Sequence, residues 1–141
     1  MSTKWTVPVL LLLGFAKPAT AQQAFVTQVF NQLQANYVES DVSFRSYVIG
    51  KLDDDATDTW TFGLTASTAY VIAAVCDNDC SDIDVQVFDP AGQLVVQDSG
   101  ADDHPVVRFV TKQEGVYKIL VRMYVCRSNP CFFGVGIFYA R

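Results

Sequence analysis

Four aspartates close together in the chain are the residues whose type and spacing best suit chemistry. Asp77 and Asp79 lie in a short loop bracketed by two cysteines, and Asp82 and Asp84 follow in a segment that alternates apolar and polar residues. Residues two apart on a strand share one face and lie about 7 Å from each other. Carboxylate oxygens are ligands that calcium prefers. We therefore predict that Asp77, Asp79, Asp82 and Asp84 bind calcium weakly, and calcium is the one cofactor that the sequence suggests.

The spacing of acidic residues from Asp77 resembles the start of an EF-hand calcium loop, but the segment does not match that motif. In an EF-hand loop that began at Asp77, Asp82 would replace the required glycine and Phe88 the closing glutamate. Like charges this close together raise each other's pKa unless a cation, backbone donors or basic side chains relieve them. The alternative interpretation is a solvated acidic loop whose aspartates cap turns through their own backbone.

Catalytic residue types are scarce in this chain. Its one histidine, His104, follows two aspartates and precedes Pro105, which is typical of a turn at the start of a strand. No Gly-x-Ser-x-Gly elbow or Cys-His arrangement accompanies it. Paired carboxylates are present, but they crowd polar loops and not the apolar pocket that keeps a general acid protonated. We therefore predict no catalytic site.

The N-terminus predicts export. A basic start, an apolar run over residues 7–16 and the sequence Ala19-Thr20-Ala21 are typical of a signal peptide over residues 1–21, cleaved after Ala21. Removing Lys4 and Lys17 leaves 8 basic against 15 acidic residues, a net charge of −7. This charge disfavours nucleic acid and anionic membranes as partners. We expect a secreted or periplasmic protein with no membrane span after cleavage.

Four cysteines in an exported chain predict two disulfides. Cys126 and Cys131 flank four residues between two strand-like segments and can face each other across a hairpin, which leaves Cys76 for Cys80. The rival pairing joins Cys76 to Cys126 or Cys131, with Cys80 taking the other, and requires both loops to meet. Zinc is disfavoured by the acidic, histidine-poor surroundings and the lack of Cys-x2-Cys spacing.

Hydrophobic periodicity predicts one helix followed by strands. Apolar residues recur three and four apart over residues 22–37, which indicates an amphipathic helix that packs on its own domain or on a partner. From Phe44 the period changes to two, with turn residues between the segments. Strands are predicted over residues 44–51, 58–64, 69–76, 82–88, 94–98, 105–111, 116–125 and 132–139.

These elements predict an all-β fold. The connections are too short for parallel crossovers, so we expect an antiparallel β-sandwich of about eight strands, jelly-roll-like, over residues 42–141, with the helix and its connection over residues 22–41. Gly134 and Gly136 leave one face of the last strand nearly bare, which could let the helix or a partner approach closely. Apolar residues predicted to face inward are Trp60, Phe62, Leu64, Ile83, Val85, Val87, Tyr117, Ile119, Val121, Met123, Val125, Phe133, Val135, Ile137 and Tyr139.

The strand motifs resemble those of the bacterial pre-peptidase C-terminal domain. The resembling segments are residues 58–62, 70–72, 82–89 followed by Gly92, and 115–121, within residues 44–140. The resemblance implies a jelly-roll-like sandwich and export. Members of that family are usually appended to secreted peptidases, and related modules in bacterial collagenases bind matrix protein and calcium.

The function that we expect is that of an exported, non-catalytic binding or accessory module for an unknown protein or polysaccharide. The alternative is a calcium-stabilised structural or assembly domain that uses its N-terminal helix. An enzyme with an unrecognised site is the third and least favoured possibility.

Overall fold

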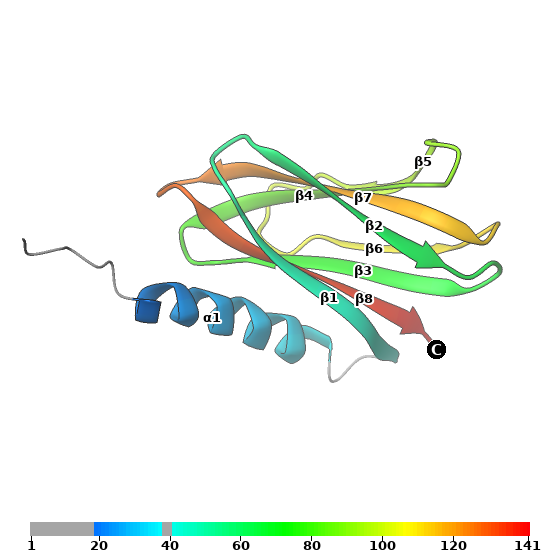
Figure 1. The fold of residues 1–141 in the computed structure, drawn as a ribbon, viewed down its shortest axis with the longest axis horizontal. Helices are drawn as coiled ribbons and strands as arrows, with labels where there is room; N and C mark the ends of the chain where they lie inside the picture. Colours follow the sequence, from blue (N-terminus) through cyan, green and yellow to red (C-terminus); the bar gives the residue numbers. More distant parts are fainter. Residues whose placement is uncertain (1–18, 38–40) are drawn as a thin grey trace, which may run out of the picture.

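The computed structural model describes residues 19–37 and 41–141. One helix precedes eight strands, and Figure 1 shows the two strand layers with the helix on one side of them. The elements are α1 (Ala19–Tyr37), β1 (Val42–Leu52), β2 (Thr57–Leu64), β3 (Ala69–Cys76), β4 (Cys80–Phe88), β5 (Leu94–Asp98), β6 (Val106–Val110), β7 (Gly115–Cys126) and β8 (Cys131–Ala140). The predicted bounds of every strand lie within two residues of these.

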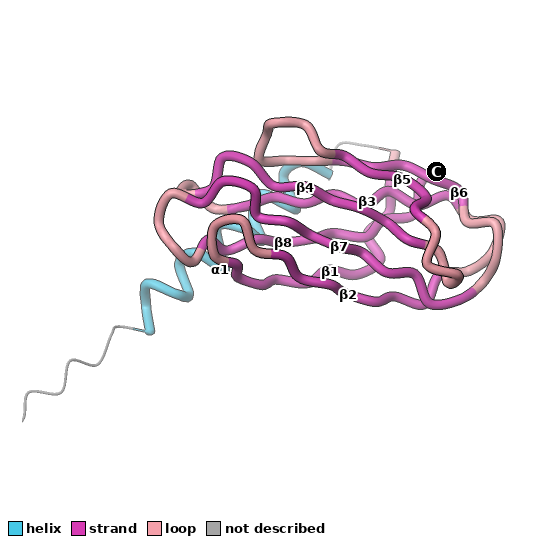
Figure 2. The backbone as a smooth tube through the Cα atoms, turned by 90° about the horizontal axis from the view of Figure 1, so that it is seen from above, coloured by secondary structure: helices cyan, strands magenta, loops and turns pink. Residues whose placement is uncertain are grey.

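Two antiparallel sheets of four strands form the sandwich. Sheet 1 has the order β1-β8-β3-β6 and sheet 2 the order β2-β7-β4-β5. Apart from β4 and β5, consecutive strands lie in different sheets, so most connections pass from one layer to the other. Figure 2, which looks down on the two layers, shows the strands running along the long axis with loops at both ends. The predicted all-β antiparallel sandwich is confirmed.

The core lies between the sheets and contains most of the residues predicted to face inward. Ile83, Val85 and Val87 of β4 are fully buried, as are alternate residues of β7 and β8. Tyr139 packs against the ring of the core residue Tyr70 but is not part of the buried core, since it is 37% exposed near the end of β8. Val125 is only half-buried, because the register between β4 and β7 shifts beside it and interrupts the alternation.

The position of β2 at the edge of its sheet explains why two of its inward residues are less buried than predicted. Trp60 and Phe62 of β2 face the core but are half-buried, while Leu64 of the same strand is buried. β2 is the outermost strand of sheet 2 and has a neighbour on one side only. Its side chains therefore lie at the open margin between the two sheets.

Helix α1 packs on the outer face of sheet 1. Val29 and Leu33 are buried against β8, β3 and β1, and with outward residues of β3 they form a second apolar cluster. A Cβ atom at Gly134 would lie 2.6 Å from Val29 and 2.7 Å from Leu33. The close approach predicted at this glycine is confirmed, and it is the helix of the same chain that approaches.

The predicted signal peptide lies mostly outside the described residues. Helix α1 begins at Ala19, three residues before the predicted mature start at Gln22. Cleavage after Ala21 stays a prediction. Among the described residues, no helix is long and apolar enough to cross a membrane.

We expect Gly134→Val to loosen α1, because the new side chain would overlap Val29 and Leu33. The free energy of unfolding should fall by about 1–3 kcal/mol, as for other overpacked cores, measured by chemical denaturation. Gly63→Val is the matched control, since nothing lies within 4 Å of a Cβ atom at that exposed strand position. Equal losses in the two variants would contradict the packing described.

Candidate functional site

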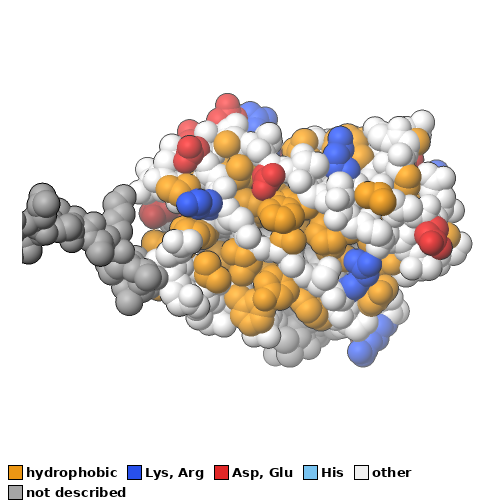
Figure 3. Space-filling view, viewed as in Figure 1, with side chains coloured by type: hydrophobic (Ala, Val, Ile, Leu, Met, Phe, Trp, Pro, Cys, Tyr) orange, Lys and Arg blue, Asp and Glu red, His pale blue; other side chains and the backbone are white. Residues whose placement is uncertain are grey.

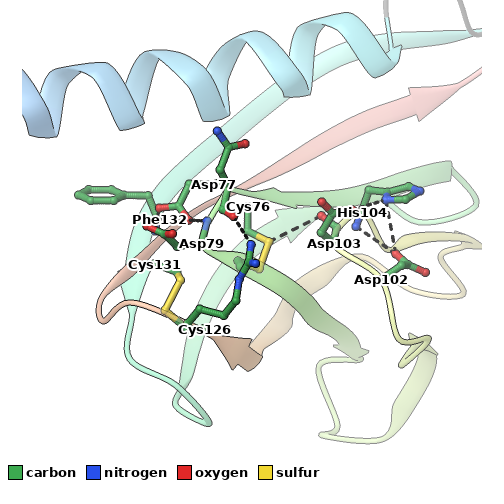
Figure 4. The surroundings of a disulfide bond; sticks show 12 residues. Cys76, Asp77, Asp79, Asp102, Asp103, His104, Cys126, Cys131 and Phe132 are labelled. Carbon is green, nitrogen blue, oxygen red and sulfur yellow. Dashed lines mark hydrogen bonds and ion pairs between the residues drawn. A yellow bond between two sulfur atoms is a disulfide. The ribbon is translucent and has the colours of Figure 1, made fainter.

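The two disulfides lie together at one end of the sandwich. Cys76 bonds to Cys80 and Cys126 to Cys131, with Cα separations of 5.9 and 5.8 Å. Cys80 pairs with Cys126 across β4 and β7, so the two loops do meet, but each cysteine pairs locally as predicted (Figure 4).

The strands that carry Cys126 and Cys131 are not arranged as predicted. β7 and β8 lie in different sheets, so Cys126 and Cys131 do not face each other across a hairpin. β3 and β4 are likewise in different sheets. Each disulfide therefore joins sheet 1 to sheet 2 beside a tight connection.

Asp77 is a buried anchor of the β3–β4 connection. Its side chain is 2% exposed, and its two carboxylate oxygens accept hydrogen bonds from the backbone N–H of Asp79 (3.1 Å) and of Phe132 (2.7 Å) (Figure 4). Its backbone pairs with the same strand, since the Asp77 N–H donates to the Phe132 carbonyl at 3.0 Å. The carboxylate thus ties the disulfide loop to β8, while Asp79 is half-buried nearby.

Asp82 and Asp84 lie half-buried on the outer face of sheet 2. Desolvation raises the pKa of Asp82 above its usual value, and the charge of Asp102 raises it further. The pKa of Asp84 is raised for the same reason, chiefly by desolvation and then by the charge of Asp82, while Arg122 opposes both shifts. One carboxylate oxygen of Asp82, Oδ1, is buried without a hydrogen-bond partner.

The acidic neighbours of this pair come from the β5–β6 region. The Ile83 N–H donates to the Asp102 carbonyl at 3.0 Å, which holds the loop after β5 beside β4. Asp98 and Asp102 therefore act on Asp84, and neither Asp77 nor Asp79 is among its electrostatic neighbours.

The predicted calcium ligands are thus divided between two places. Within residues 19–37 and 41–141, no group of three or more His, Cys, Asp or Glu side chains is arranged to hold a metal ion. Calcium binding by the four aspartates stays a prediction. Sequence reasoning missed Asp98, Asp102 and Arg122, because strand pairing and loop packing between distant segments bring them there: Arg122 faces Asp84 from β7, Asp98 ends β5, and Asp102 lies in the loop after β5.

His104 lies beside two aspartates and is open to solvent. Its Nδ1 lies 2.7 Å from Asp103 Oδ1 and 3.8 Å from Asp102 Oδ1, and its side chain is 64% exposed. The hydrogen bond with Asp103 raises the pKa of His104. These contacts suit a turn residue, as the sequence indicates.

The outer face of sheet 2 has no covering element in the described part of the chain, whereas α1 covers the opposite sheet (Figure 1). Lys118 lies over the ring of Phe88 at 4.6 Å, and Arg122 lies over the ring of Tyr124 at 4.6 Å. Arg122 also binds the Asp55 carboxylate. We call this surface the open face; its residues are Thr57, Thr59, Thr61, Asp82, Asp84, Gln86, Phe88, Gln97, Val116, Lys118, Leu120, Arg122 and Tyr124.

Comparison with known proteins identifies the fold. No family model and no curated protein matches the sequence. The chain is similar to the pre-peptidase C-terminal domain of a collagenase from Bacillus anthracis, with a TM-score of 0.54 and 14% identity over 67% of this chain and 90% of that one. It is also similar to PliG, a periplasmic inhibitor of g-type lysozyme from Aeromonas hydrophila, with a TM-score of 0.44 and 15% identity over 71% and 89%.

The class that these observations define is a disulfide-linked β-sandwich. Its fold is like that of the pre-peptidase C-terminal domain, as the strand motifs predicted.

We expect Asp77→Ala to destabilise the protein by about 2–4 kcal/mol, because two backbone N–H groups would lose a charged acceptor in a buried place. Chemical denaturation with and without EDTA measures the effect, which should not depend on calcium. Asp79→Ala is the control, with an expected loss below about 1 kcal/mol. Similar losses in both variants would contradict the anchoring role of Asp77.

Asp82→Asn should stabilise the protein at neutral pH. Because the folded state raises the pKa of Asp82 above 3.8, the stability linked to this group is full below that value and is lost as pH rises through the folded pKa. The neutral amide avoids this loss, so the gain at pH 7 should shrink towards pH 4. We expect a gain below about 1 kcal/mol, since solvent screens a half-exposed charge.

Chemical denaturation at pH 4, 5.5 and 7 checks this prediction. Asp53→Asn, the same change in an exposed turn, should leave the midpoint unchanged. A lower midpoint for Asp82→Asn than for the unmutated protein at pH 7 would mean that the ionised carboxylate stabilises the fold.

Proposed function

We propose that this chain is an exported, non-catalytic binding module that holds its ligand on the open face of sheet 2. The observation that carries the proposal is the asymmetry of the sandwich. On one outer face α1 packs over β8, β3 and β1, and on the other no element of the described residues covers the strands. The two disulfides support a location outside the cytoplasm, in the periplasm or beyond the cell.

The chemistry of the open face suits an extended, polar polymer. Thr57, Thr59 and Thr61 are exposed and lie on one side of β2, so their hydroxyls repeat about every 7 Å. Hydroxyls both donate and accept hydrogen bonds, and so do the hydroxyls of a sugar or the amides of a peptide. Tyr124, 48% exposed, adds an aromatic surface beyond the Thr57 end of this row.

The charges on this face favour a neutral ligand. Arg122 already binds Asp55 and lies beside Asp84, and basic and acidic side chains are interspersed on the surface. No single sign dominates, so a strongly charged polymer would meet repulsion as well as attraction. Among the partners expected from the sequence, a neutral polysaccharide is the first choice and an extended protein segment the second.

Pull-down of the mature protein on insoluble chitin, cellulose and peptidoglycan, together with binding to an array of exported proteins, tests the proposal. Thr59→Lys and Tyr124→Ala should each weaken binding at least about tenfold, as the loss of a main contact does. Gln113→Lys, an exposed change outside the open face, is the control. Binding that survives both open-face variants would place the ligand elsewhere and overturn the proposal.

A calcium-stabilised domain is the second candidate. It is supported by the raised pKa values of Asp82 and Asp84 and by the unpartnered oxygen of Asp82, which a cation would relieve. Melting the mature protein with calcium, with magnesium and with EDTA tests it. An unchanged melting temperature in calcium would reject this candidate, and a rise that Asp82→Asn abolishes would support it.

A further inference from the structure

We propose that the outer face of α1 is an interface between two copies of this chain. The proposal concerns the opposite side of the sandwich from the open face and does not depend on the binding function.

The first observation is the absence of charge on the helix. Residues 19–37 contain no Asp, Glu, Lys or Arg, although the helix lies at the surface. In Figure 3, orange and white side chains gather where α1 lies, and the red and blue ones lie over the strands and loops. Solvent-exposed helix faces normally carry charged residues, whereas charged residues are depleted at the centre of protein interfaces.

Charge also decides which partner fits. The predicted mature chain has a net charge of −7, so two copies repel each other across most of their surfaces. The outer face of α1 is a long surface where two copies can meet without placing like charges opposite each other. A basic partner would instead be drawn to the acidic loops and gain nothing from a neutral helix.

The second observation is the spacing of residues on this helix face. The face is nearly flat and open to solvent, and its residues form two rows spaced four apart. One row is Gln23, Thr27, Asn31 and Ala35, and the other is Ala24, Gln28 and Gln32. Rows of this spacing interlock with the same rows of another helix at a crossing angle near −50°. The small side chains of Ala24, Thr27 and Ala35 allow the two helices to approach closely.

The chemistry of the face is self-complementary. Asn and Gln side chains each donate and accept hydrogen bonds, so a residue near a two-fold axis can pair with its own copy. Asn31 and Thr27 are exposed at the middle of this face and would lie near that axis.

Residues on the two sides of this helix face mark where the proposed interface ends. Gln28 Nε2 already donates to Asn78 Oδ1 at 2.8 Å, which fixes one side of the helix to the β3–β4 connection. Beyond Gln32 lie Asp103 and His104, which contact each other. Charged groups therefore stand at the rim of the surface and not at its centre, as in interfaces generally.

Analytical ultracentrifugation of the mature protein from about 1 to 300 µM, the range of a modest interface, tests the proposal. We expect a reversible equilibrium between monomer and dimer. Thr27→Glu and Asn31→Asp place like charges across the two-fold axis and should each weaken the dimer at least about tenfold. Gln113→Glu adds the same charge away from α1 and should leave the equilibrium unchanged.

Disulfide cross-linking through an introduced cysteine tests the proposed dimer independently. The described residues contain no free cysteine, so Asn31→Cys adds the one thiol there, and mild oxidation should link two copies through it. Thermal melts confirm that each variant is folded, as expected for exposed positions. A protein that is monomeric throughout, a dimer that survives both charged variants, or a thiol that fails to cross-link would each overturn the proposal. Failure of the polysaccharide and protein pull-downs would leave it standing.

Discussion

The packing of α1 against β8 is the contact on which the rest of this structure depends. Gly134 has no side chain, and Val29 and Leu33 occupy the space that a Cβ atom would need. This close approach buries the outward residues Val71 and Ala73 of β3, which would otherwise be exposed apolar surface. The helix therefore buries the part of the outer face of sheet 1 that β8 and β3 form, while Phe44 of β1 and Val110 of β6 stay exposed on the same face.

Two consequences follow from this arrangement. Sheet 2 has no helix over its outer face in the described part of the chain, so a ligand has one broad strand surface available there. At the end of the sandwich, both disulfides and the buried carboxylate of Asp77 join strands that belong to different layers or connections. Short-loop disulfides add only about 2 kcal/mol each in the chain-entropy model. Their effect is to hold the two layers in fixed positions at the acidic end.

The features that depend on neighbouring residues in the chain could be predicted from the sequence. Alternation of apolar residues placed the strands and most of their inward faces, and the glycines of β8 indicated where a helix could approach. The sheet order, by contrast, depends on contacts between distant segments. For that reason Cys126 and Cys131 were expected in a hairpin although their strands lie in different sheets. The same limit hid the loop that brings Asp102 beside Asp82, and a polar loop sequence gave no sign that Asp77 would be buried.

Native-state hydrogen exchange of the mature protein, read at the amides of residues 25–33, tests directly whether α1 belongs to the cooperative fold. If α1 is an integral layer of the fold, these amides should be protected with opening free energies close to those of β3 and β8. Exchange of these amides at the rates of an unfolded peptide, while the strands stay protected, would show that α1 is not a layer of the folded sandwich.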